Sequence, residues 1–256
     1  MRLLRPLATA LGLLAAWQAI VWASGVPPFI LPGPDQVAAA LLAQPLLLLR
    51  HAAVTLQEIL LGIVLGSMVG AASAVLLAAS RRAQRWLMPL LVISQALPVF
   101  ALAPLLVLWL GYGMASKVAM AVLIIYFPVT AALFDGLRRT EPGWIELART
   151  MDASPWAILR QIRLPAAMPA LASGLRVAAA VAPIGAVVGE WVGSGAGLGY
   201  LMLHANARMQ VDLLFAALLI LAGMALVLWL AVDRLGRSLA SWQPESLAPS
   251  FAGDRR

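Results

Sequence analysis

The sequence predicts an all-α integral membrane protein with six transmembrane helices. Of its 256 residues, 62% are hydrophobic and only 11% are charged. A soluble domain of this composition would lack the polar residues needed to cover its surface. The apolar residues also form long runs separated by short polar and basic segments, which is typical of membrane-spanning helices. The chain has no Cys, which excludes disulfides, thiol catalysis and Cys-based metal sites.

The first span is expected within residues 7–23. Trp17 and Trp22 near its far end are typical of an aromatic belt at the membrane interface, which favours a retained span. A cleaved secretory signal is the alternative, with a poor cleavage site at 21–23. After a proline-rich outside loop, residues 35–49 predict a helix near the outer surface. We therefore expect residues 1–53 to form the amino-terminal part of the protein.

The remaining five spans are expected at about 54–79, 86–110, 116–137, 166–190 and 213–232. Together they define a main domain at 54–234, followed by a cytoplasmic tail at 235–256.

Two of these spans are irregular. The span at 86–110 contains Pro89, Pro98 and Pro104, and such breaks at membrane depth require protein or a water-filled cavity around the freed backbone. This span is therefore a candidate wall of a pathway. The span at 166–190 must carry Arg176, because the apolar run after Arg176 is too short to cross a hydrocarbon core that needs about 20 residues.

The basic residues set the orientation of the predicted spans. The net charge of +7 would also suit nucleic-acid binding, but the Lys and Arg residues form short clusters between apolar runs. Fourteen of the 18 fall on one side of the six-span topology, three fall on the other, and Arg176 lies within a span. The positive-inside rule then places both termini and the polar segment 141–165 in the cytoplasm.

The segment 141–165 predicts two short helices. The first covers about 143–151, and the second follows Ser154 and Pro155, because Ser is a favoured N-cap and Pro is tolerated at the first helical position. Asp152 occupies the turn between them, and Asp is one of the few residues that tolerates a left-handed conformation. The segment indicates a docking surface for a cytoplasmic partner, with apolar side chains from Trp144, Leu147, Trp156 and Ile158.

No enzymatic or nucleotide site is evident. The single Lys, Lys117, follows Ser116, so the chain lacks the Gly-Lys-Ser/Thr phosphate loop and needs a separate ATPase if ATP drives it. Ser194 and His204 are the only tempting Ser–His pair, but they lie outside a Gly-x-Ser-x-Gly frame and no partner orients His204. Two His residues form no metal-ligand set. We expect a transport subunit that is not an enzyme and has no cofactor of its own.

Polar and aromatic residues near the spans are candidates for a substrate pathway: Gln95, Pro98, Arg176, Glu190 and Trp191. Three of them have a structural alternative. Gln95 could form a helix–helix hydrogen bond, Arg176 could extend to the inner interface, and Glu190 could be a solvated carboxylate at the start of a Gly-rich loop, 189–199.

The polar segment resembles a known motif. Glu146-Leu147-Ala148, Asp152 and Ile162-Arg-Leu164-Pro165 resemble the EAA loop of ATP-binding-cassette (ABC) importer permeases, Glu-Ala-Ala-x3-Gly-x9-Ile-x-Leu-Pro. The sequence departs from that motif at Leu147 and Asp152. The resemblance implies a type I ABC importer permease fold with coupling helices that dock into the ATPase. It assigns this coupling role to Glu146, Leu147, Ala148, Asp152, Ala153, Ile162, Leu164 and Pro165.

The same resemblance implies partners and a location. They are a second permease copy, two ATPase subunits that bind ATP and magnesium, and an extracytoplasmic solute-binding protein in a bacterial inner membrane. An ATP-independent secondary transporter or channel is the alternative class, and it would be expected to show inverted repeats. No convincing similarity between the two halves of the chain is visible.

Other segments indicate a branch of the family. Residues 103–113, 173–176 and 197–200 resemble permeases for nitrate, taurine and alkanesulfonates, whereas 94–100, 182–191 and 204–210 look closer to those for hydroxymethylpyrimidine, a thiamine precursor. Gln95 is neutral where anion importers commonly have an Arg-Pro pair, and Glu190 would repel an anion. A neutral or weakly basic heterocycle is therefore favoured, with taurine, alkanesulfonate, nitrate and riboflavin as alternatives.

Overall fold

The computed structural model describes residues 4–239 and 242, and these contain helices and no strand. The helices are α1 (Leu4–Ser24), α2 (Pro34–Ala43), α3 (Pro45–Ala79), α4 (Arg81–Ala96), α5 (Val99–Leu110), α6 (Met114–Arg138), α7 (Pro142–Thr150), α8 (Pro155–Ile158), the π-helix η1 (Leu159–Arg163), α9 (Leu164–Gly193), α10 (Leu198–Ala207) and α11 (Val211–Leu239).

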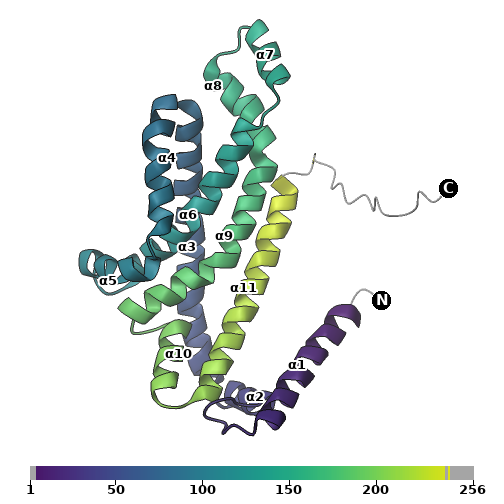
Figure 1. Cartoon of the computed structure of the whole chain (residues 1–256), viewed down its shortest axis with the longest axis vertical. Coiled ribbons are helices and arrows are strands. Elements are labelled where there is room, and N and C mark those ends of the chain that lie inside the picture. The colour runs from purple at the N-terminus through teal and green to yellow at the C-terminus, as the bar shows by residue number, and fades with distance from the viewer. Residues whose placement is uncertain (1–3, 240–241, 243–256) are drawn as a thin grey trace, which may run out of the picture.

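The core of the bundle is built from α3, α6 and α9, with α11 packed against α9 (Figure 1). Small residues allow this close approach, as is common where helices meet in a membrane. A Cβ added to Gly70 of α3 would lie 2.6 Å from the Tyr126 carbonyl oxygen of α6. One added to Gly185 of α9 would lie 2.7 Å from the Cα of Ala121. Larger residues at these positions would separate the helices.

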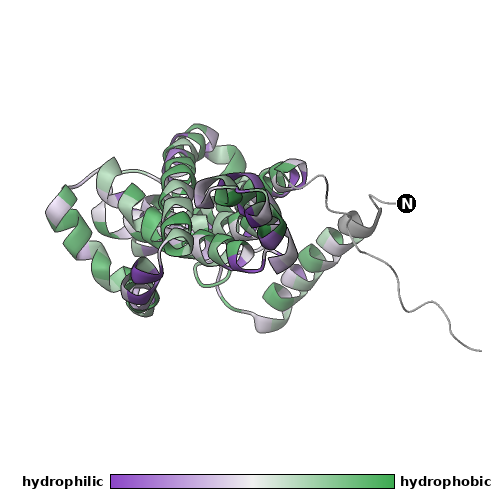
Figure 2. Cartoon of the chain, turned by 90° about the horizontal axis from the view of Figure 1, so that it is seen from above, coloured by the Kyte–Doolittle hydropathy of each residue, from purple (hydrophilic) through white to green (hydrophobic). Residues whose placement is uncertain are grey.

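The helices run between two chemically different ends (Figure 1). One end holds the α3–α4 turn, α7, α8 and the last turn of α11. We call it the basic end because it carries Arg81, Arg82, Arg85, Arg138, Arg139, Arg149, Arg160, Arg163, Arg234 and Arg237. The opposite end, which we call the α10 end, holds α2, α10 and the start of α11. Figure 2, which looks along the long axis of the molecule, shows that hydrophobic residues cover most of the helices and that hydrophilic residues form short patches.

Four stretches of the described residues are each long and apolar enough to cross a membrane: α3, α6, α11 and the continuous helical segment Pro155–Gly193. The span expected at 86–110, with its proline breaks, is divided into α4 and α5, which are bent by 101° relative to one another. Pro98 lies at this bend as the N-cap of α5, where its missing N–H removes a helical hydrogen bond. α1 contributes a shorter apolar helix, Ala8–Ser24.

Several expected boundaries also differ from the structure. The break expected after residue 53 falls inside α3, and the outer helix expected at 35–49 is divided at Gln44, because Pro45 starts a new helix. The tail expected from residue 235 is helical as far as Leu239, where α11 ends. Of that tail, residues 240–241 and 243–256 lie outside the described residues.

Candidate functional site

The turn between α7 and α8 has the geometry that its sequence predicts. Asp152 is left-handed, with φ of 56°. Its N–H donates to the Arg149 carbonyl at 3.0 Å, and the Ala153 N–H donates to the Ala148 carbonyl at 3.0 Å. These two bonds are the Schellman closure that usually places glycine at the left-handed position. The left-handed turn at Asp152 is therefore confirmed, with an Asp in the position that favours Gly.

The second helix of the segment starts as expected but does not remain short. The Ser154 hydroxyl accepts a hydrogen bond from the Ala157 N–H at 3.2 Å, with Pro155 in the first turn. α8 then continues through the π-turn η1 into α9 without a break. The continuous helix connects the segment 141–165, for which the sequence predicts a coupling role, directly to the bundle.

Arg163 of η1 fastens the segment to α6. Its Nε and one terminal nitrogen both donate to the Leu137 carbonyl, at 3.1 and 2.9 Å. That carbonyl lies in the last turn of α6, where backbone acceptors lack helical partners and the helix dipole favours a cation. The sequence contained a basic residue at this position but nothing that identified its acceptor.

A groove of about 1010 Å³ lies between α7 and the start of α9. Trp144, Leu147 and Met151 line it from the α7 side, and Ile162 and Pro165 line it from the α9 side. The three α7-side residues are 52%, 62% and 74% exposed, a large apolar contribution to the surface. Such an exposed patch is typical of an interaction site.

The predicted docking residues divide between this surface and the interior. Ile158 is buried, so its expected place on the docking surface is wrong, whereas Trp156 is exposed. The eight coupling residues all lie in this part of the chain, and their exposure varies: Glu146, Leu147, Asp152 and Pro165 are exposed, Ala153, Ile162 and Leu164 are half-buried, and Ala148 is buried.

The five pathway candidates do not form one site. Gln95 is exposed on α4, and its Nε2 donates to the Leu123 carbonyl of α6 at 3.4 Å. This contact is the helix–helix hydrogen bond considered as its alternative role. Arg176 of α9 forms an ion pair with Asp233 of α11 at 3.2 Å, which joins two helices near the basic end.

Trp191 and Pro98 lie in the same region of the structure. Trp191 is exposed on α9, and its indole N–H donates to the Gly199 carbonyl at 3.0 Å. Its ring meets Phe100 edge-on, with centroids 6.3 Å apart. Phe100 follows the bend at Pro98 by two residues. The structure thus links the broken α4–α5 pair to the end of α9.

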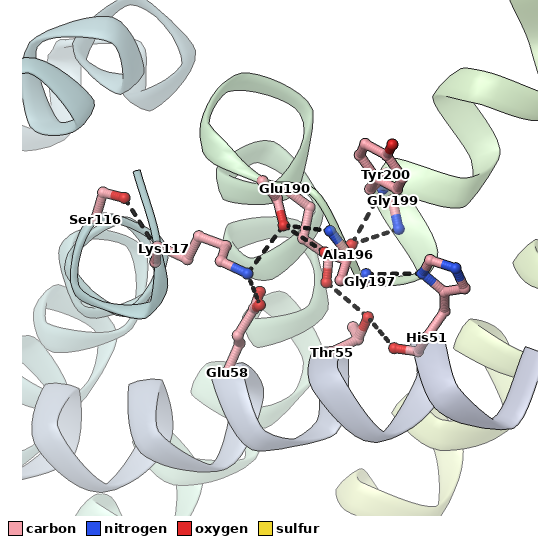
Figure 3. Close-up of polar contacts among 12 residues, drawn as sticks. His51, Thr55, Glu58, Ser116, Lys117, Glu190, Ala196, Gly197, Gly199 and Tyr200 are labelled. Carbon is pink, nitrogen blue, oxygen red and sulfur yellow. Dashed lines mark hydrogen bonds and ion pairs between the residues drawn. The ribbon is translucent and has the colours of Figure 1, made fainter. Parts of the chain in front are cut away.

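Glu190 is buried, and the expected solvated loop end is wrong, because α9 continues to Gly193. Its Oε1 accepts from the Thr55 hydroxyl at 2.6 Å, and its Oε2 accepts from the backbone N–H groups of Gly199 and Tyr200. Those N–H groups belong to the first turn of α10, whose N-cap Gly197 has no side-chain acceptor. Glu190 therefore caps α10 from a neighbouring helix (Figure 3).

Glu58 and Lys117 form a buried ion pair beside this cap (Figure 3). Glu58 of α3 is 0% exposed and Lys117 of α6 is 5% exposed. The Lys117 ammonium also donates to the Ser194 hydroxyl at 3.0 Å. We call Thr55, Glu58, Lys117 and Glu190 the buried charge cluster. It joins α3, α6 and α9 at the α10 end.

Sequence reasoning missed this cluster. None of the sequence predictions paired Lys117 with Glu58. The available signal was a lone Lys and a lone Glu within otherwise apolar stretches, since an ionisable residue in a span is expected to have a partner.

Over its described residues the chain is thus a helical bundle with apolar spans, a broken helix pair and an exposed apolar groove at one end. Residues 59–242 match the family described as the binding-protein-dependent transport system inner membrane component, and the chain belongs to that family. The chain is therefore a permease subunit of an ABC importer. This result excludes the alternative class, an ATP-independent transporter or channel.

Curated relatives align along most of the chain. A probable ABC transporter permease protein of Haemophilus influenzae is 59% identical, over 91% of this chain and 96% of its own length. The formylaminopyrimidine transport permease protein ThiX of Halalkalibacterium halodurans is 36% identical, over 84% and 87%. The riboflavin transport system permease protein RibX of Chloroflexus aurantiacus is 39% identical, over 92% and 88%.

A solved structure shows the same fold. A chain of the inward-facing MetNI methionine ABC transporter aligns with a TM-score of 0.68 at 21% identity, covering 77% of this chain and 98% of its own. The type I ABC importer permease fold expected from the sequence is confirmed.

Proposed function

We propose that this chain imports a small neutral or weakly basic heterocycle, of the hydroxymethylpyrimidine type, by alternating access driven by a separate ATPase. The observation that carries the ATPase coupling is the exposed apolar groove beside α7. A monomer gains nothing by exposing Trp144, Leu147 and Met151 together. The continuous helix from α8 into α9 would transmit a displacement of the docked segment to the bundle.

The proposed assembly contains two copies of this permease, two ATPase subunits that bind ATP and magnesium, and an extracytoplasmic solute-binding protein. We assign the basic end to the cytoplasm, which places both termini there and the α10 end outside. The gathering of ten Arg residues at one end supports this orientation in a bacterial inner membrane.

The substrate class rests on relatives and on charge. The ThiX relative is named for formylaminopyrimidine transport, which supports a pyrimidine solute. The similar identity of the RibX relative makes riboflavin the second candidate. Both solutes contain planar heterocycles. The neutral Gln95 supports such a solute over taurine, alkanesulfonate or nitrate.

Two measurements test this function. The first is co-purification of the permease with its ATPase in mild detergent. Leu147→Asp places a charge in the groove, and we expect at least a tenfold loss of bound ATPase and of uptake, because an unpaired buried charge costs several kcal/mol. Glu146→Ala tests the coupling role of the exposed carboxylate. The control is Leu235→Asp, a Leu of comparable exposure (54%) near the end of α11 that does not line the groove. Unchanged association in Leu147→Asp would refute docking at the groove.

The second measurement identifies the solute. The cognate binding protein is tested for retention of hydroxymethylpyrimidine, riboflavin and taurine, followed by uptake of the retained solute through the complete transporter. Selective retention and uptake of hydroxymethylpyrimidine is the expected result. Tight retention of taurine alone would overturn the substrate assignment and leave the ATPase coupling intact.

A further inference from the structure

A second hollow lies at the α10 end, away from the coupling groove. It has a volume of about 630 Å³ and lies between α9, α10 and α11. Its walls include Ile184, Trp191, Met202 and Leu218, and no charged residue of the described part of the chain lines it. The volume falls within the range of pockets that bind small molecules, which are usually apolar with a few polar groups.

The indole of Trp191 is held in place on one wall of this hollow. Its N–H donates to the Gly199 carbonyl, and the Phe100 ring packs edge-on against the indole ring. The ring is nevertheless 43% exposed. A fixed aromatic ring with its donor already satisfied offers a solute apolar and stacking contact, and no hydrogen bond.

Among the described residues, Asn206 is the one with an amide, hydroxyl or charged side chain that lines the hollow. A carboxamide supplies both donors and an acceptor. Within the described residues, the Asn206 side chain makes no hydrogen bond, so both functions remain available. The helix that carries it is fixed at both ends. Glu190 caps the first turn of α10, and the Gln210 N–H closes its last turn on the Ala205 carbonyl at 2.9 Å.

We propose that this hollow is a solute contact site, in which Asn206 hydrogen-bonds the polar edge of a small neutral planar ring and Trp191 provides its apolar wall. The proposal rests on the function proposed above and adds the residues that select the solute. An uncharged lining with one carboxamide suits a ring with adjacent donor and acceptor atoms. It is unsuited to a sulfonate, which would enter without a compensating cation.

The test uses the complete transporter in proteoliposomes, with radiolabelled hydroxymethylpyrimidine delivered by the cognate binding protein. Asn206→Leu keeps the approximate volume and removes the hydrogen bonds. We expect it to lower the maximal uptake rate about tenfold, the effect of one lost hydrogen bond to the solute. Asn206→Gln should restore most of the rate. Trp191→Leu should also slow uptake, whereas Trp86→Leu, an exposed Trp on α4, should not.

Basal ATP hydrolysis by the assembled complex separates a solute contact from a folding defect, because only the latter should lower it. Normal hydrolysis with slow uptake in Asn206→Leu supports the site. Equal uptake by Asn206→Leu and the wild-type protein would overturn the site and leave the substrate class standing. If the wild-type protein carries riboflavin instead, the same variants are measured with riboflavin. Transport of taurine would overturn both proposals.

Discussion

The two ends of the molecule differ in which side chains they expose and which they bury. At the basic end, apolar Trp144, Leu147 and Met151 are exposed beside a groove. At the α10 end, the charges of Glu58, Lys117 and Glu190 are buried. Both arrangements cost free energy in an isolated chain. The exposed apolar side chains require another chain to cover them. The buried charges instead have partners within this chain: Lys117 for Glu58, and the Thr55 hydroxyl with two α10 N–H groups for Glu190. We infer that one end is built for reversible docking and the other for internal rigidity.

This comparison predicts the largest loss of stability at the α10 end. Lys117→Met would remove the ammonium and leave the Glu58 carboxylate buried without a counter-charge. Breaking one side of a buried ion pair costs about 3–5 kcal/mol. We expect a clear fall in the thermal unfolding temperature of the detergent-solubilised permease.

The double variant Lys117→Met with Glu58→Gln is the matched control. It removes both charges, so it should recover most of the lost stability, since replacing a whole buried pair is often close to neutral. A double variant no more stable than Lys117→Met would show that the pair does not account for the loss.

The cap on α10 predicts a more local effect. Glu190→Ala removes the acceptor of the Gly199 and Tyr200 N–H groups and leaves the Thr55 hydroxyl without its 2.6 Å partner. We expect a cost of about 2 kcal/mol, within the range for lost caps and unsatisfied buried groups. Hydrogen exchange should accelerate at residues 198–200 and stay unchanged in α6. Unaltered protection of residues 198–200 would exclude the capping role.

The hydrogen bonds between Arg163 and α6 lead to a third prediction. Their loss should lower stability less than the changes above, and should lower transport more than stability. Arg163→Met removes two hydrogen bonds to the Leu137 carbonyl. We expect a cost of about 1–2 kcal/mol and a fall in the uptake achieved per ATP hydrolysed, because the docked segment would move without displacing α6. Arg160→Met, at an exposed neighbouring position, is the control. Equal coupling in both variants would contradict this role.

The sequence was most informative where the determinants are local. Ser154 and Pro155 marked the start of α8, and Asp152 marked the left-handed turn, because caps and turns depend on residues a few positions apart. The span at 116–137 lies within α6, since a long apolar run between polar turns has one stable conformation in a membrane.

Non-local features were inaccessible to the same reasoning. The Lys117–Glu58 pair is separated by 59 residues and the Thr55–Glu190 bond by 135, so neither has a sequence pattern. The glycines after residue 189 predicted a loop. Gly189 and Gly193 are instead helical, because α9 approaches Lys117 and Val107 closely there. Pro98 indicated a break, but its 101° bend depends on the packing of α5 against α6 and α9.

The smallest predicted effects concern the left-handed turn that follows a short helix at each end of the molecule. Met209 follows α10 as Asp152 follows α7, with φ of 60° and the same pair of closing hydrogen bonds. Glycine at a left-handed position avoids the Cβ clash that other residues incur. Met209→Gly should therefore raise stability by about 1 kcal/mol, whereas Asp152→Gly should gain only about 0.5 kcal/mol, because Asp tolerates this conformation better than Met.

Thermal unfolding of the two single variants, measured in the same detergent, gives the comparison directly. If Met209→Gly gains more stability than Asp152→Gly, the tolerance of Asp for the left-handed conformation is enough to account for Asp at position 152. If Asp152→Gly instead lowers ATPase association while leaving stability unchanged, the exposed carboxylate contributes to docking. The departure from the Gly of the EAA motif would then be a feature of the partner surface.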